Sequence, residues 1–331
     1  MTKSKGQIAG LALWHGFPCN VQLVTCIFLA LFSTWALAAP PKDLLPAGLV
    51  QVYEGGDELG LRHPSDVLMT PDGRVLVLDG VSNRVVIYGA DGRFQGAFGK
   101  GGKGEGELSQ PLGMALDAGG NLYIADSGNG RIQIYGTDGE YRATLELPRD
   151  EDQKRPEPTG LAVDDKRGLL YVVDNENHRV LIYGLADRNL IGAVGKMSNL
   201  ADGFRWPFSI SLDRAGVAYI VDVINTRVRT LLPDEGFEFG MDVGRWGVEK
   251  GELFRPKGVA VDASGRIFIS DSYLGVIQVF DHRGRFRAVL GDGDGKVKRF
   301  VTPTRLCFDK QGRLFVVEMF ANRVGVYQIG P

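Results

Sequence analysis

The stretch PLGMALDAGGNLYIADSGNGRIQIYGTDG, residues 111–139, decides the fold of this chain. It contains short apolar runs at 114–116, 122–125 and 132–135, and a fourth run follows at 141–147. Runs of this length, with alternating or continuous apolar positions, are typical of β-strands. Asp-x-x-Gly and Asp-Gly pairs separate them, and glycine tolerates the positive φ that hairpins need. The stretch therefore predicts a unit of four short antiparallel strands.

The same phrase recurs along the chain, with a leading proline, an acid that closes the second strand, and a loop that leads to an arginine. The leading prolines are Pro64, Pro111, Pro158, Pro207, Pro256 and Pro303. The acids are Asp79, Asp126, Asp174, Asp222, Asp271 and Glu318, spaced by 47, 48, 48, 49 and 47 residues. About 47 residues with four strands is the size of one propeller blade. We therefore predict an all-β, six-bladed β-propeller of four-stranded antiparallel blades.

The two ends of the chain indicate how the ring closes. The last copy of the phrase stops after its third strand, at 327–331, and an unassigned strand signal lies at 49–53, before the first copy. We predict that this N-terminal strand completes the last blade, which removes an exposed sheet edge.

The repeated phrase resembles the NHL repeat, whose pattern runs roughly P-x-G-x-A-x-D-x-x-G-x-x-Y-V-x-D-x-x-N-x-R-I-x-x-F. The resemblance covers residues 49–331 and implies a propeller scaffold. It leaves the function open, because function resides in sites placed on folds. Similar propellers include protein-binding and RNA-binding domains of ubiquitin ligases, sensor domains of bacterial receptor kinases and exported bacterial proteins. A minority of related propellers are metal-dependent lyases or lactonases.

The N-terminal residues differ from the repeats. Lys3 and Lys5 precede an apolar run at 21–37, which ends in the small-residue sequence Ala-Leu-Ala at 36–38. This order is typical of a secretory signal peptide. The alternative is an uncleaved membrane anchor, because the apolar run is borderline in length for a membrane span. We expect three parts: a signal peptide at 1–38, a short linker at 39–48 and the propeller at 49–331.

The charge balance limits the possible partners, and the cysteine content limits the possible disulfides. Without residues 1–38 the chain has 36 basic and 40 acidic side chains, a balance that favours neither nucleic acid nor a membrane surface. Of three cysteines only Cys307 remains, so no internal disulfide can form. We expect an exported monomer, periplasmic or extracellular, that contacts a membrane only through the N-terminal segment if this stays uncleaved.

The loop between each second-strand acid and the following arginine is the most repeated polar element, as in Asp126, Asn129 and Arg131. Because most copies share it, we interpret it as structural. The carboxylate can accept hydrogen bonds from loop amides, and the arginine can pair with an acid.

Apolar side chains interrupt this polar loop in some copies. Two positions beyond the acid, four copies carry an apolar residue: Val81, Ile224, Tyr273 and Phe320. Residues beside the leading prolines should lie on the same rim. We predict a partner-binding rim patch made of Trp206, Phe208, Ile224, Tyr273, Phe320, Arg255 and Lys257. The alternative is that the apolar members fold down onto neighbouring blades.

The position two residues after the leading proline is glycine in three copies and Asp66, Ser209 or Arg305 in the others. The first and last copies adjoin in a closed ring, so we expect Asp66 and Arg305 to pair at the channel mouth. The predicted channel-mouth set is His63, Asp66 and Arg305.

These features favour a non-catalytic exported scaffold that binds a protein, peptide or glycan of the cell envelope, without a cofactor. The alternative is a metal-dependent lyase or hydrolase, lactonase-like or amidating-lyase-like, with Asp66 and His63 at the channel mouth. The three histidines after residue 38 lie in different repeats, and no serine elbow or Cys–His pairing is visible. We therefore assign no catalytic or metal-binding residue.

Overall fold

The computed structural model describes residues 43–330, which form strands joined by turns. The helical elements in this part of the chain are two short 3-10 turns, η1 (Pro233–Glu235) and η2 (Met319–Ala321). No helix in it is long and apolar enough to cross a membrane. The signal peptide or anchor predicted at 1–38 lies outside the described residues.

Four separate sheets of four strands each follow one another along the chain. The first sheet contains β2 (Pro64–Met69), β3 (Val75–Asp79), β4 (Arg84–Tyr88) and β5 (Phe94–Phe98). The second contains β6 (Gly113–Leu116), β7 (Asn121–Asp126), β8 (Arg131–Gly136) and β9 (Tyr141–Glu146). The third contains β10 (Pro158–Asp164), β11 (Leu169–Asp174), β12 (Arg179–Gly184) and β13 (Leu190–Val194). The fourth contains β14 (Pro207–Leu212), β15 (Ala218–Asp222), β16 (Arg227–Leu232) and β17 (Glu238–Val243).

The remaining strands form one continuous eight-stranded sheet in the order β18-β19-β20-β21-β1-β24-β23-β22. Its members from the fifth repeat are β18 (Pro256–Val261), β19 (Ile267–Asp271), β20 (Val276–Phe280) and β21 (Phe286–Gly291). Those from the two ends of the chain are β1 (Leu44–Tyr53), β22 (Pro303–Phe308), β23 (Arg313–Glu318) and β24 (Arg323–Ile329).

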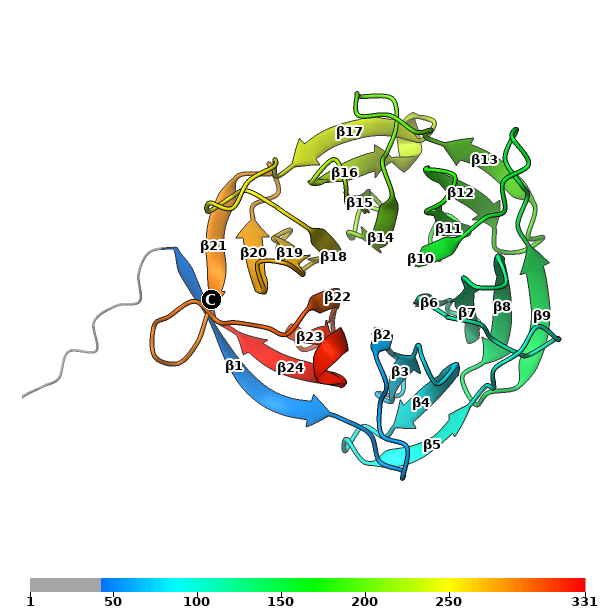
Figure 1. Cartoon of the computed structure of the whole chain (residues 1–331), viewed down its shortest axis with the longest axis horizontal. Coiled ribbons are helices and arrows are strands. Elements are labelled where there is room, and N and C mark those ends of the chain that lie inside the picture. Colours follow the sequence, from blue (N-terminus) through cyan, green and yellow to red (C-terminus); the bar gives the residue numbers. More distant parts are fainter. Residues whose placement is uncertain (1–42, 331) are drawn as a thin grey trace, which may run out of the picture. The chain divides into compact units, whose positions relative to one another are not determined.

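The N-terminal strand β1 joins these two groups. Its later part pairs antiparallel with β24, with Leu49 opposite Tyr327 and Tyr53 opposite Val324. Its first three residues pair in parallel with β21, with Leu44 opposite Val289. Figure 1 shows β1 running along the outside of β24 and reaching the end of β21.

The prediction of six separate four-stranded blades is therefore wrong. The described chain has four separate four-stranded blades, and the strands of the last two repeats form a single eight-stranded sheet. The physical reason is the length of β1, which begins at Leu44 rather than at the predicted residue 49 and so extends beyond β24 to β21. Residues 44–48 are consequently strand and not linker, while residues 49–53 pair with the C-terminal strand as the sequence indicated.

The sheets pack face against face around a central axis. The innermost strands, β2, β6, β10, β14, β18 and β22, each contact the next and close a ring, as Figure 1 shows. Leu76 and Leu78 of β3 pack with Leu122 and Ile124 of β7, and all four side chains have 0% exposure. Burial of each such side chain stabilises the fold by about 1.5–3 kcal/mol. This apolar core holds the loops at the rim in fixed positions.

Candidate binding site at the loop rim

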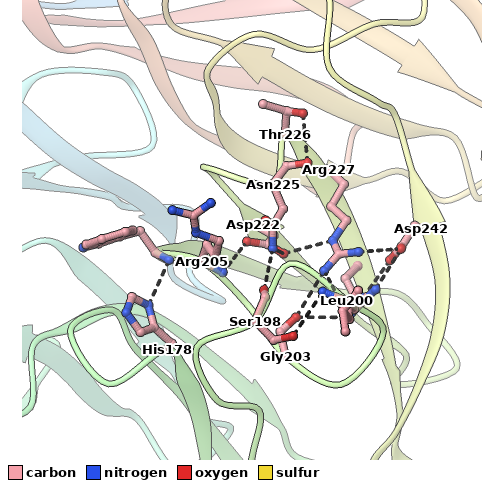
Figure 2. Close-up of polar contacts among 12 residues, drawn as sticks. His178, Ser198, Leu200, Gly203, Arg205, Asp222, Asn225, Thr226, Arg227 and Asp242 are labelled. Atoms are coloured by element: carbon pink, nitrogen blue, oxygen red, sulfur yellow. Dashed lines mark hydrogen bonds and ion pairs between the residues drawn. The ribbon is translucent and has the colours of Figure 1, made fainter.

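A buried acid organises each rim loop. Asp222, at the end of β15, is fully buried and accepts hydrogen bonds from Arg205 N (2.7 Å), Asn225 Nδ2 (2.7 Å) and Arg227 Nε (2.9 Å), as Figure 2 shows. In every repeat the equivalent acid accepts a backbone hydrogen bond of 2.6–3.0 Å from the residue 17 positions earlier. This repeated element satisfies backbone groups of the loops, which is the structural role that its repetition indicates.

The fifth repeat departs from this pattern, because Val276 stands where the other repeats have the arginine. Asp271 instead accepts hydrogen bonds from four backbone amides: those of Phe254 (2.6 Å), Arg255 (3.0 Å), Tyr273 (3.1 Å) and Leu274 (3.0 Å). These contacts fix the backbones of Arg255 and Tyr273, two of the predicted rim residues.

A second set of contacts joins the rim loop of one repeat to the residue before the leading proline of the next. The three pairs are Gln110 N to Asn83 Oδ1 (2.8 Å), His63 N to Asn322 Oδ1 (2.8 Å) and Trp206 N to His178 Nδ1 (3.1 Å). Each donor residue has a left-handed backbone, with φ of 47–53°. The side-chain acceptor thus stabilises a conformation that such residues seldom adopt.

His178 positions Trp206. The histidine is 4% exposed, and its ring meets the Trp206 ring edge to face, with centroids 4.8 Å apart. Burial lowers the pKa of His178, with help from the nearby cations Lys154 and Arg205. A neutral ring can accept the Trp206 amide hydrogen at Nδ1, whereas a protonated ring carries hydrogens on both nitrogens. The neutral form is therefore the one that holds the Trp206 loop.

Four of the apolar rim residues are exposed, whereas Phe208 is partly buried and packs against the core of the fourth and fifth repeats. Tyr273 is 67% exposed, Phe320 61%, Ile224 45% and Trp206 38%. The aromatic side chains pack against neighbouring rings of the same rim. The ring centres of Tyr273 and Phe254 lie 4.4 Å apart, and those of Phe320 and His63 lie 5.3 Å apart. The rim thus presents large apolar side chains to solvent, held by local stacking.

A pocket of about 390 Å³ lies on this rim, over the third to fifth repeats. The structure places five of the predicted rim residues in its lining: Trp206, Phe208, Ile224, Arg255 and Lys257. Tyr273 and Phe320 do not line it. The predicted patch therefore divides into a pocket and two exposed aromatic residues beyond it.

Two hydrogen bonds, one buried and one partly buried, fix the inner wall of the pocket. The Thr159 hydroxyl donates to the Phe208 carbonyl oxygen (2.8 Å), and Asn175 Nδ2 donates to the Pro207 carbonyl oxygen (2.8 Å). Thr159 and Asn175 belong to the third repeat and the residues they hold belong to the fourth. The wall formed by Phe208 is thereby preorganised across the boundary between two sheets.

The pocket contains two ionisable groups, Lys257 and Glu157, whose charged forms are disfavoured by burial. The Lys257 ammonium lies 4.0 Å from the centre of the Phe208 ring. Burial lowers the pKa of Lys257 to about 8, and the cations Arg255 and Arg305 act in the same direction. Burial also raises the pKa of Glu157, to which the neighbouring acids Glu176 and Asp174 contribute. Glu157 opposes the shift of the Lys257 pKa and Lys257 opposes that of Glu157, but burial outweighs both effects, so each group shifts toward its neutral form.

Arg305 occupies the centre of the channel. Its Nη1 donates to the Ser209 hydroxyl (2.6 Å), its Nη2 donates to the Thr159 carbonyl oxygen, and its Nε lies 3.9 Å from Asp66 Oδ2. The guanidinium carbon also lies 5.5 Å from the centre of the Phe208 ring. The predicted pairing of Asp66 with Arg305 is present, and the arginine extends from the last repeat to residues of the first, third and fourth.

Glycines at the equivalent position leave room for this arginine. A Cβ at Gly113 would lie 2.5 Å from the Thr159 carbonyl oxygen and 3.0 Å from Arg305 Nη2. A Cβ at Gly258 would overlap the Thr304 carbonyl oxygen. The innermost strands approach so closely that only some repeats can carry a side chain here, which explains the mixture of glycine with Asp66, Ser209 and Arg305.

The predicted channel-mouth set is only partly assembled. Asp66 and Arg305 line a second cavity, of about 790 Å³, whereas His63 does not line it. The His63 side chain stacks on Phe320 at the rim. Asp66 accepts hydrogen bonds from Val67 N and Met114 N, both 2.8 Å, and burial raises its pKa although Arg305 opposes the shift. Within residues 43–330, no three His, Cys, Asp or Glu side chains are grouped as a metal site would require.

These features define a β-propeller with a ligand-sized pocket among its rim loops. The NHL repeat model matches residues 108–135 and 156–183, so the second and third repeats of the chain are similar to NHL repeats. The Drosophila melanogaster protein brain tumor is 33% identical over 76 residues, which are 23% of this chain and 7% of that protein.

Solved structures share the fold at low sequence identity. A virginiamycin B lyase from Staphylococcus aureus is similar with a TM-score of 0.57 and 15% identity, over 79% of each chain. A gluconolactonase from Xanthomonas campestris is similar with a TM-score of 0.63 and 14% identity, over 89% of this chain and 99% of its own. At such identities the likeness concerns the architecture.

Sequence reasoning missed four lining residues of the rim pocket: Glu157, Thr159, Asn175 and Val223. The signal for two of them was available. Glu157 and Thr159 flank the leading proline Pro158, as Trp206 and Phe208 flank Pro207. Applying the same rule to the third repeat would have added both residues to the prediction.

Proposed function

We propose that this NHL-repeat propeller is an exported, non-catalytic scaffold that binds a protein or peptide partner of the cell envelope through its loop rim. The observation that supports this function is the exposure of Tyr273 and Phe320, at 67% and 61%, on the rim that also carries the pocket. Large aromatic side chains at one rim, next to a concave pocket, are the usual anchors of a partner surface.

The energetic argument concerns solvent exposure. Covering an aromatic side chain that is mostly exposed contributes about 1.5–3 kcal/mol. Two such residues and the partly exposed Trp206 could therefore supply several kcal/mol to an interface, before the cost of association is subtracted. The loops that carry these residues are held by buried acids, so little order has to be created on binding.

Site-specific photocross-linking tests the proposal. A benzophenone amino acid placed at Tyr273 or at Phe320, in the full chain and in its own cells, should cross-link to the same partner. The matched control is Leu190, which is 45% exposed on the outer strand β13. If the two rim positions yield no cross-link, or the same products as Leu190, the rim is not a partner surface.

A further inference from the structure

Within residues 43–330 the cations of the rim pocket form no close ion pair, and Glu157 is the acid that shares the pocket lining with them. The side chains of Arg255 and Lys257 form neither an ion pair nor a hydrogen bond with residues 43–330. The rim arginines behave differently, since Arg84, Arg131 and Arg179 each pair with the acid of their own loop at 2.8–3.0 Å. Arg255 and Lys257 therefore supply charge that the fold itself does not use.

Lys257 is the more constrained of the two. Its ammonium lies over the Phe208 ring, 4.0 Å from the ring centre, and the charged Arg305 lies on the same ring at 5.5 Å. Arg305 has Asp66 as its counter-ion at 3.9 Å, but Lys257 has no comparable partner. The lowered pKa of Lys257 fits an ammonium that Glu157 compensates only in part. An anion that entered the pocket would complete the compensation.

Glu157 limits how much negative charge the pocket accepts. It is the acidic residue of the lining, opposed there by Arg255 and Lys257. With both cations charged, the lining carries a net charge of about +1, which suits one carboxylate better than a multiply charged group.

The apolar side chains of the pocket lining indicate that the rest of the ligand is apolar. Trp206, Phe208 and Ile224 line the same pocket, so the anionic group must be attached to apolar surface. The exposed Tyr273 and Phe320 continue the apolar rim through the fifth and sixth repeats, beyond the pocket. A peptide segment that passes along the rim satisfies both features, because it can place one acidic side chain in the pocket and apolar side chains on the aromatic residues.

We propose that the rim pocket binds an acidic side chain of a partner peptide, with its carboxylate between Arg255 and Lys257 and its apolar neighbours on Trp206, Phe208 and Tyr273. This inference rests on the proposed function, since it specifies the chemistry of the partner at the same rim. The ligand is an Asp or Glu residue flanked by apolar residues within a peptide chain.

Peptide display supplies the ligand with which the proposed carboxylate site is tested. Short random peptides, joined to a carrier at both ends so that no terminal carboxylate is free, are selected on the full-length protein. We expect enrichment of sequences with one Asp or Glu beside apolar residues. Selection of apolar peptides without an acid would overturn the proposed carboxylate site and leave the partner surface intact. No enrichment at all would also overturn it, while cross-linking at Tyr273 decides the proposed function separately.

Variants then locate the carboxylate. Lys257→Met and Arg255→Met should each weaken a selected peptide roughly tenfold or more, because each removes a charge-assisted contact. The control Lys103→Met removes an exposed lysine that does not line the pocket and should leave affinity unchanged. Replacing the acid of the peptide by Gln should weaken binding to the parent protein by a similar factor, with a much smaller effect on Lys257→Met. Equal binding of the Asp/Glu and Asn/Gln peptides would refute the proposal.

The variant Tyr273→Ser distinguishes the carboxylate site in the pocket from the apolar contact surface on the rim. It should weaken the acidic peptide and its amide analogue by the same factor, because it removes apolar contact and no charge. The carboxylate could also come from the C-terminus of a peptide. A competing peptide that ends in a free carboxylate but lacks an acidic side chain tests this source. Tighter binding of that peptide than of the internal acid would contradict the assignment to a side chain.

Discussion

Replacing Arg305 by Met should destabilise the protein and leave a specific signature in pH. The arginine is 4% exposed, and its loss would leave Asp66, which is 8% exposed, without its nearest cation. Removing one partner of a buried ion pair costs about 3–5 kcal/mol. We expect the low end, about 3 kcal/mol, because Asp66 keeps its two backbone hydrogen bonds of 2.8 Å from Val67 and Met114.

The expected change in melting temperature follows from the size of the domain. The entropy of unfolding is about 2.1 cal/mol/K per residue, so the 288 residues from 43 to 330 correspond to roughly 0.6 kcal/mol/K. A loss of about 3 kcal/mol then lowers the melting temperature by about 5 °C. Thermal and urea unfolding, followed by circular dichroism, measure both quantities. Lys310→Met, an exposed lysine that lines the second cavity, is the matched control and should shift neither.

The pH dependence tests the cause. The pKa of Asp66 is already raised by burial above its ordinary 3.8, and Arg305 is the cation that opposes this shift. In Arg305→Met the pKa of Asp66 rises further, so the folded state binds a proton that the unfolded state releases. The stability of the variant therefore increases as pH falls from above the pKa of Asp66 in the folded state toward 3.8. The difference in stability between the parent and the variant should shrink over the same range. A deficit that is the same at pH 7 and pH 5 would refute this explanation.

Three further outcomes follow from features of the rim and the ring. Deleting residues 49–53 removes the pairing with β24 and should abolish cooperative unfolding; a truncated protein that melts like the parent would contradict the role of β1 in closing the ring. His178→Ala removes the acceptor of the Trp206 amide and should cost about 1 kcal/mol, whereas His178→Asn, which carries the acceptor used in two other repeats, should recover most of it in urea titrations. Affinity for an acidic peptide should fall as pH rises through the Lys257 pKa of about 8, since the free ammonium loses its proton there, and calorimetry at pH 7 and pH 9 would show no change if Lys257 were not involved.

The repeated phrase was sufficient to predict the strands and their order within each repeat, because local patterns of apolar and turn residues encode them. It could not predict how many separate sheets result. That number depends on whether β1 pairs with one neighbour or two, and the parallel pairing of Leu44 with Val289 joins residues far apart in the sequence. Nothing in the apolar pattern of residues 44–48 distinguishes a strand from a linker, since Pro46 and Gly48 interrupt it.

The candidate site could be predicted where the equivalence of the repeats was applied. Trp206 and Lys257 were found because residues beside the leading prolines share one rim. Tyr273 and Phe320 lie outside the pocket, because equivalent positions in successive repeats spread around a ring and need not converge. His63 was predicted at the channel mouth with Asp66 and Arg305, but its left-handed backbone and its stacking on Phe320 keep it at the rim.

The double pairing of β1 has a mechanical consequence. Hydrogen bonds between paired strands run across the strand direction, perpendicular to it in the antiparallel pairing with β24 and slanted in the parallel pairing with β21. A force applied along β1 from its N-terminal end would therefore load many of these bonds in shear. The two pairings follow one another along β1, residues 44–46 with β21 and residues 47–53 with β24, so force applied along the strand meets both. Tension applied at this end would therefore be shared between the last two repeats before it reached the rim loops.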